Sequence, residues 1–166
     1  MTDVNPDIWT HYTLDHLGLS LDIFADQSFL TVRRDGALTT LIQDRGAVRL
    51  VLWAGPGETL ESWRERLNVR GEAHFEPEVN AVICGREARS QTAIVTEGGA
   101  VGAFIDAQGI VGHMYQDVAT RVHACVSFAH ARQHVLVCWI VNEDARAARA
   151  ADERRFFASV QCRVLS

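Results

Sequence analysis

The feature that most constrains this chain is an alternation of apolar and polar residues, which fills two long blocks separated by one helical segment. The first block runs from about Leu17 to Trp53 and the second from Val79 to Val141. Apolar residues at every second position are typical of strands with one buried face. Helical spacing occurs at Thr59–Leu67 and again at about Asp144–Gln161. This order predicts an α+β fold with a single antiparallel sheet of roughly six to nine strands, on which a mid-chain helix and a C-terminal helix pack.

Turns that contain glycine divide the two blocks into hairpins. Asp35-Gly36 lies between two strand patterns and suits a type I′ turn, in which both central residues have positive φ. Gly85 predicts a second turn after Val79–Cys84, and Gly98-Gly99 predicts a third before a strand at Ala100–Asp106. We therefore expect the strands on the two sides of each turn to be antiparallel neighbours.

The last expected hairpin turns at Ala131-Arg132, and this position fixes how its strands pair. A loop of two residues places Cys125 opposite Cys138, whereas a longer or bulged loop would shift the pairing by one and send the two cysteines to opposite faces. The two-residue loop is favoured because it gathers the apolar side chains on one face. This face should hold Val122, Ala124, Val126, Phe128, Val135, Val137, Trp139 and Val141, and Trp139 is predicted to lie in the core.

The mid-chain helical segment has a clear start and one apolar face. Gly55-Pro56-Gly57 ends the preceding strand, and the Thr59 side chain can accept hydrogen bonds from the free N–H groups of the first turn. The apolar residues are spaced as one stripe of a helix. They are Leu60, Trp63 and Leu67. Trp63 is therefore predicted to be a second buried tryptophan.

Length and terminal composition point to one domain over residues 1–166. Met1–Thr10 is polar and acidic, so we expect it to be loosely ordered and to lack the features of a signal peptide. No segment reaches the ~20 consecutive apolar residues of a membrane span. These observations predict a cytoplasmic protein whose four cysteines are free thiols, because disulfides are rare in that compartment.

The basic residues restrict the chemistry, since all 16 are arginine and the chain contains no lysine. This composition excludes a Schiff-base lysine, a lysine nucleophile and the lysine of a phosphate-binding loop. It is typical of a bacterium with a GC-rich genome. The net charge of −5 and the lack of a dense basic block argue against a nucleic-acid partner.

One face of the last hairpin carries a set of polar and sulfur-containing residues, which we predict to bind a partner. Imidazole and thiolate groups are also zinc ligands. His134 lies roughly 13 Å from Cys138 along the strand at ~3.3 Å per residue, however, which is too far for a shared metal. We expect no metal and no cofactor. The predicted partner-binding residues are Arg121, His123, Cys125, His134 and Cys138.

The chain contains Cys, His and Asp residues, but their spacing matches no motif of a catalytic nucleophile, and no catalytic residue is predicted. The alternative hypothesis is a small-molecule-binding or thiol-dependent enzyme that uses Cys125 or Cys84 with a nearby His. A catalytic thiol with a lowered pKa would alkylate quickly near neutral pH, whereas core thiols would react only after denaturation.

Three segments carry a resemblance to a known family: Thr59–Trp63, Val135–Val141 and Phe156–Val160. Together with the order of elements from about His11 to Arg163, they resemble the Mog/PsbP-like family. The resemblance implies an α/β/α sandwich around an antiparallel sheet, generally without an active site. It also implies a protein-binding role, as an adaptor or an effector chaperone. No residue matches a Ran-binding position, so that activity is not implied, and the partner, including a second copy of the chain in a homodimer, is not identified.

Overall fold

The computed structural model describes residues 8–70, 72–105, 107–109 and 111–164. Within these residues the chain forms two antiparallel sheets and two α-helices, α1 (Leu60–Arg70) and α2 (Ala150–Ala158). The α+β class is confirmed, but the prediction of a single sheet is wrong. The strands nearest the N-terminus belong to a separate sheet that packs against one face of the large sheet. This packing buries their apolar residues without extending the large sheet.

The large sheet has eight strands and positions the rest of the molecule. Its strands follow the order β3-β4-β5-β10-β9-β8-β6, and β7 also pairs with β8. Most neighbours are joined by short turns, but β5 and β10 are distant in sequence and lie side by side, with Val48 opposite Val141. The strands are β3 (Leu30–Asp35), β4 (Leu38–Asp44), β5 (Val48–Gly55), β6 (Glu72–Phe75), β7 (Val79–Ile83), β8 (Arg86–Ile105), β9 (Val111–His130) and β10 (Gln133–Asn142).

The small sheet has three strands in the order β1-β2-β11. Strand β2 was expected from the alternation of its leucines, whereas the two outer strands were not predicted. Residues 9 and 10 belong to β1, which corrects the expectation of a loose segment over residues 1–10; residues 1–7 lie outside the described part of the chain. The strands are β1 (Trp9–Leu14), β2 (Leu19–Phe24) and β11 (Gln161–Cys162).

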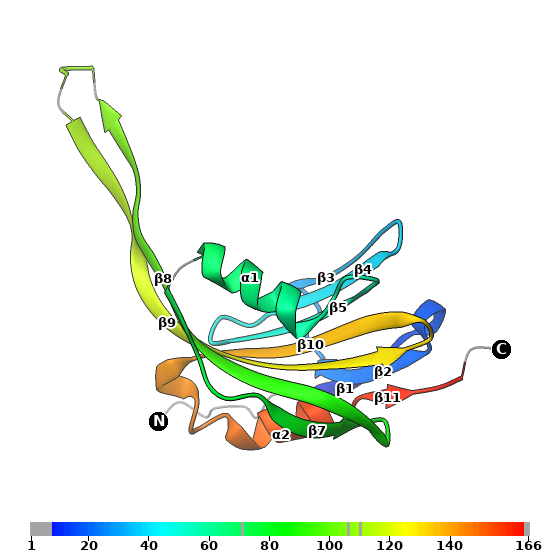
Figure 1. The fold of residues 1–166 in the computed structure, drawn as a ribbon. Coiled ribbons are helices and arrows are strands. Elements are labelled where there is room, and N and C mark those ends of the chain that lie inside the picture. Colours follow the sequence, from blue (N-terminus) through cyan, green and yellow to red (C-terminus); the bar gives the residue numbers. More distant parts are fainter. Residues whose placement is uncertain (1–7, 71, 106, 110, 165–166) are drawn as a thin grey trace.

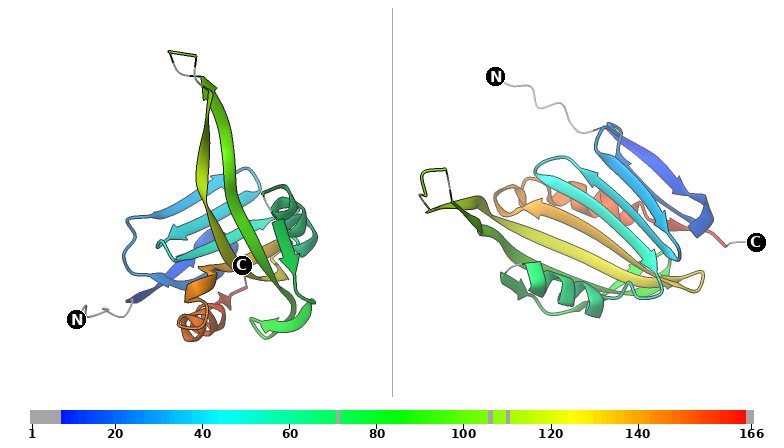
Figure 2. Two further views of the ribbon diagram at one scale, coloured as in Figure 1. Left: turned by 90° about the vertical axis from the view of Figure 1, so that its left-hand side faces the viewer. Right: turned by 90° about the horizontal axis from the view of Figure 1, so that it is seen from above.

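The elements form layers, with α1 on one face of the large sheet and α2 with the small sheet on the other (Figures 1 and 2). Trp139 is 1% exposed in the core between the two sheets, where its ring lies 6.4 Å from that of Phe24 and 5.7 Å from that of Phe156. Trp63 is buried in a second core beneath α1. Both predictions of buried tryptophans are confirmed.

A buried glutamine joins the two sheets. The side chain of Gln43, on β4, accepts a hydrogen bond from the Phe24 N–H at 2.8 Å. Its amide nitrogen donates to the carbonyl oxygens of Phe24 at 2.8 Å and Asp26 at 2.9 Å. These bonds give hydrogen-bond partners to backbone groups at and just after the end of β2, which pairs with no strand of the large sheet.

Two predicted turns have the expected geometry and one differs. Ala131 and Arg132 both have positive φ, and the pairing of β9 with β10 places Cys125 opposite Cys138 as predicted. The Gly85 turn also forms, with Cys84 at φ 56°. The β3–β4 hairpin is confirmed, but its loop lies one residue later than predicted, and in it only Gly36 has positive φ.

Gly98-Gly99 does not form the predicted turn, because β8 continues through these residues to Ile105. The pairing of β8 with β9 shifts register between Glu97 and Gly99, and again between Ala100 and Gly102. Glycine tolerates such irregularities because it lacks a Cβ atom. The result is a long hairpin whose outer part projects away from the sheets (Figure 1). Residues 106 and 110 lie outside the described part of the chain.

The predicted C-terminal helix over Asp144–Gln161 is shorter than expected. A 3₁₀ turn covers Glu143–Ala145, and α2 begins only at Ala150. The helix ends where the Ser159 hydroxyl donates to the Phe156 carbonyl at 2.6 Å. None of the described helices is both long and apolar enough to cross a bilayer.

Candidate partner-binding face

The candidate site is the face of the large sheet that carries α1, here called the α1 face. Side chains alternate along each strand, so Cys125 on β9 and Cys138 on β10 point to this face together with Ile140. Leu60, Trp63 and Leu67 of α1 cover them, as the helical spacing predicted. The helix therefore hides the middle of the face and leaves its two sides open.

The start of α1 is fixed by a reciprocal cap. The Ser62 N–H donates to the Thr59 hydroxyl oxygen at 3.2 Å, and the Thr59 N–H donates to the Ser62 hydroxyl oxygen at 3.1 Å. This confirms Thr59 as the capping residue and satisfies N–H groups that have no partner inside the helix.

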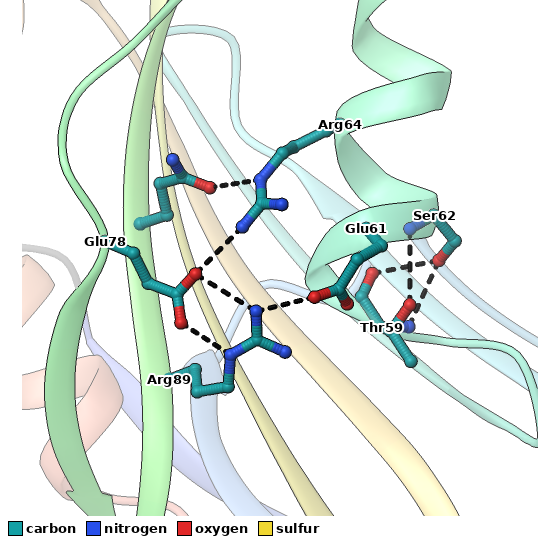
Figure 3. Close-up of polar contacts among 7 residues, drawn as sticks. Thr59, Glu61, Ser62, Arg64, Glu78 and Arg89 are labelled. Atoms are coloured by element: carbon teal, nitrogen blue, oxygen red, sulfur yellow. Dashed lines mark hydrogen bonds and ion pairs between the residues drawn. The ribbon is translucent and has the colours of Figure 1, made fainter.

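Four charged residues, here called the ion-pair cluster, fasten α1 to β8: Glu61, Arg64, Glu78 and Arg89 (Figure 3). Arg89 donates to Glu78 at 2.5 Å and to Glu61 at 2.6 Å. Arg64 donates to Glu78 at 2.9 Å. Arg64 also donates to Gln91 at 2.7 Å, so the cluster reaches a buried amide of the sheet. Because Arg89 and Gln91 lie on β8, these contacts set the position of the helix on the sheet.

The cluster changes the acid–base behaviour of its carboxylates. Hydrogen bonds from Arg89 lower the pKa of Glu61 to about 2. The same guanidinium lowers the pKa of Glu78. Hydrogen bonds to the ionised form of a carboxyl group favour that form. Both carboxylates therefore stay charged over the ordinary pH range and keep the helix attached.

A hollow of about 720 Å³ opens beyond the N-terminal end of α1, and we call it the N-terminal hollow. Small side chains from the sheet lie in it, and Val82 of β7, which lines it, is 71% exposed. An exposed apolar residue beside small residues is the type of surface that a partner side chain can cover. The lining residues that matter here are Thr59, Val82, Arg89, Ser127, Ala129 and His134.

A second hollow of about 570 Å³ lies along the side of α1. The indole of Trp53 lines it, and the guanidinium of Arg66 lies over this ring at 4.7 Å from its centroid. Arg66 also pairs with Glu58 at 2.7 Å. The hollow combines aromatic surface with charged groups at its rim, including Glu58 and Glu65.

All five predicted partner-binding residues come from the α1 face, as the register required, but the structure does not bring them together at one place. His123 and Cys138 are buried and line the second hollow, and Cys125 is buried beneath α1. His134 is exposed and lines the N-terminal hollow, whereas Arg121 is half-buried further along β9. The binding role of the set stays a prediction.

The prediction of four free thiols is wrong. Cys125 and Cys138 form a disulfide across β9 and β10, and Cys84 and Cys162 form a second one between the Gly85 turn and β11. The sequence located the first pair correctly, with Cα atoms 4.2 Å apart. It did not indicate that the pair is bonded, because strand register fixes proximity and not oxidation state.

Sequence reasoning missed several residues of this face. Arg89, Glu78 and Val82 lie on or beside β7 and β8, whose alternation was recognised but whose position against α1 was not. The sequence carries no local signal for these residues, because their role depends on where α1 lies against β7 and β8. Across the described residues, no group of three or more metal-ligating side chains comes together.

Comparisons with known proteins show the fold. No family model and no curated protein sequence matches this chain. The solution structure of cyanobacterial PsbP from Synechocystis matches over 98% of this chain and 97% of its own, with a TM-score of 0.57 and 8% identity. The crystal structure of the Saccharomyces cerevisiae Ran-binding protein Mog1p matches over 95% of this chain and 96% of its own, with a TM-score of 0.50 and 7% identity. The resemblance inferred from the sequence is therefore confirmed at the level of the fold.

Proposed function

We propose, from the Mog/PsbP-like fold and the geometry of the α1 face, that this protein is a non-catalytic protein-binding module that acts as an adaptor or chaperone. The similar yeast structure is that of a Ran-binding protein, which supports a protein as the kind of partner. The observation that carries the proposal is the N-terminal hollow, where exposed Val82 adjoins small residues of the sheet. The small side chains let the backbone of a partner segment approach the sheet closely, and an apolar side chain of the partner would cover Val82.

The test compares two exposed valines. Tagged wild-type protein, Val82→Glu and Val32→Glu are purified from the native organism, and the co-purified proteins are quantified. Val32 lies on β3, at the opposite edge of the large sheet, and is also exposed. We expect a partner that is retained by wild type and Val32→Glu and is reduced at least about tenfold by Val82→Glu, because a buried charge disrupts an apolar contact. Equal recovery of every partner by all three proteins would contradict the proposal.

A second candidate function has one observation in its favour. The hollow beside Trp53 and Trp63 has the size and aromatic lining of a small-molecule site. An enzyme that depends on a free thiolate of Cys125 or Cys84 has no such support, since both are in disulfides. The test is to screen a library of aromatic fragments for binding. Tryptophan fluorescence is the readout, and Trp53→Phe is the comparison variant.

The cytoplasmic location stays a prediction, and the disulfides bear on it. Structural disulfides persist mainly in oxidising compartments. Alkylation of thiols in intact cells, before lysis, distinguishes the two locations. Alkylated Cys84 and Cys162, which are half-buried, would favour the cytoplasm, whereas unmodified Cys84 and Cys162 would favour an oxidising compartment.

A further inference from the structure

The end of the chain forms a strap, residues 159–163, that lies along the open edge of β2. The Asp22 N–H donates to the Ser159 hydroxyl oxygen at 2.8 Å, and Cys162 lies opposite Leu19 in the β2–β11 pairing. The Arg163 N–H donates to the Gly18 carbonyl at 2.8 Å. The strap therefore occupies the backbone groups of β2 that would otherwise face solvent.

The non-covalent contacts at the outer end of the strap are few. Strand β11 is only two residues long. The side chain of Arg163 pairs with Asp15, but both side chains are more than half exposed, and exposed ion pairs add little stability. Val160, by contrast, is buried in the core between the sheets. The strap is thus anchored at its start, while the part after Val160 depends on other contacts.

The Cys84–Cys162 disulfide supplies that contact. Cys84 lies in the turn between β7 and β8, so the bond ties the strap to the large sheet as well as to β2. Both sulfurs belong to half-buried residues, whereas Cys125 and Cys138 have no exposed surface beneath α1. A reductant therefore reaches the Cys84–Cys162 bond more easily than the other disulfide.

We propose that the Cys84–Cys162 disulfide is a redox-controlled fastening of the strap, and that its reduction frees the edge of β2. The reductant is a dithiol, small or protein-borne. Its two thiols give two electrons and two protons to the disulfide, which yields thiols on Cys84 and Cys162 and a disulfide in the reductant. The residues after Val160 then leave β2, and its edge at Leu19 and Ser20 becomes available to an extended segment. This edge lies on the other side of the large sheet from the α1 face and is independent of the function proposed above.

The first measurement is the order of reduction. Folded protein is titrated with dithiothreitol, quenched with acid, alkylated with N-ethylmaleimide in denaturant and mapped by mass spectrometry. We expect Cys84 and Cys162 to be alkylated at reductant concentrations that leave Cys125 and Cys138 bonded. Simultaneous reduction of both pairs would overturn the proposal, because the Cys84–Cys162 disulfide could not then be reduced while the other disulfide stays intact.

The second measurement is amide hydrogen exchange, read by NMR at single residues. The amide at position 163 reports the strap, because it donates to Gly18, and the amide of Val137, in the centre of the large sheet, reports the fold. On selective reduction we expect exchange at position 163 to rise about tenfold or more, to about the rate of an unprotected amide, while Val137 still exchanges at least about a hundredfold more slowly. Unchanged protection at position 163, or loss of protection at both positions, would overturn the proposal.

Two variants separate the disulfide from the ion pair. Cys162→Ser should open the strap under oxidising conditions, as reduction does in the wild type. Arg163→Ala removes the ion pair with Asp15 but keeps the disulfide and the backbone N–H at this position, so exchange at position 163 should stay at the level of the oxidised protein. Protection at position 163 that survives in Cys162→Ser, or that is lost in Arg163→Ala, would show that the disulfide does not hold the strap.

Discussion

Trp139 is the residue whose side chain contributes most clearly to the core between the sheets, where it contacts rings from β2 and α2. Trp139→Ala should lower the free energy of unfolding by roughly 3–5 kcal/mol, because removal of the indole would leave a cavity enclosed between the two sheets. Urea denaturation measures this loss. Trp53→Ala, at a half-buried position, is the comparison and should cost less. A loss below about 1 kcal/mol for Trp139→Ala would contradict its buried position.

Gln43 is a polar residue at a buried position, where it serves three backbone groups at the end of β2. Gln43→Leu keeps the approximate volume but leaves those groups without partners, and should cost about 2–4 kcal/mol. Gln133→Leu, at a half-buried position, should change stability by less than about 1 kcal/mol. Thermal and urea unfolding of both variants would show whether the bonds of Gln43 hold the sheets together.

At the scale of elements, the attachment of α1 should depend on acid pH. The pKa of Glu61 is lowered to about 2 by hydrogen bonds from Arg89, whereas an unfolded chain has the ordinary value of 4.5. A lowered carboxyl pKa stabilises the folded state fully above the unfolded value, and this stabilisation is lost as the pH falls from about 4.5 towards 2.

Urea unfolding monitored by tryptophan fluorescence at a series of acid pH values measures this loss. Glu61→Gln should show a shallower fall in stability between about pH 5 and pH 3 than the wild type. Glu65→Gln, on the same helix but outside the ion-pair cluster, should follow the wild type. Identical acid profiles for all three proteins would mean that Glu61 does not couple α1 to protonation.

The sequence predicted those elements that are determined by residues close together in the chain. The β9–β10 hairpin and its register follow from alternation and from a two-residue turn, and α1 follows from Thr59 and one apolar stripe. The projecting hairpin was missed because Gly98-Gly99 is compatible with either a turn or an irregular strand, and only the pairing with β9 decides between them. The second sheet was missed because alternation shows that β2 has a buried face but does not show what covers it.

The candidate site was predictable only in part, for the same reason. The register correctly placed His134 and Cys138 on one face. It could not show that α1 covers Cys138 and leaves His134 open, because that depends on the contacts of Arg64 with Gln91 and of Arg89 with Glu61, which are distant in sequence. Val82 gained its importance from position alone, as an exposed residue beside the end of α1.

For the whole molecule, the two disulfides should contribute unequally to stability. The Cys84–Cys162 bond joins residues 78 apart and the Cys125–Cys138 bond joins residues 13 apart. In the chain-entropy model a longer loop constrains the unfolded chain more, by about 4.5 and about 3 kcal/mol respectively. Replacing each pair with alanines and measuring urea unfolding tests this order. A larger loss for the buried pair would show that core packing outweighs chain entropy here.

The pairing of β5 with β10 has a consequence for how the chain reaches this fold. It joins segments about 80 to 90 residues apart, whereas the other pairings of the large sheet lie within two local groups, β3 to β5 and β6 to β10. Closing so long a loop costs entropy before any contact compensates for it, so we expect the groups to form first and to meet late. Until they meet, β5 and β10 present apolar edges. Refolding yield should therefore fall as protein concentration rises, because two chains can join at these edges before one chain closes its own sheet.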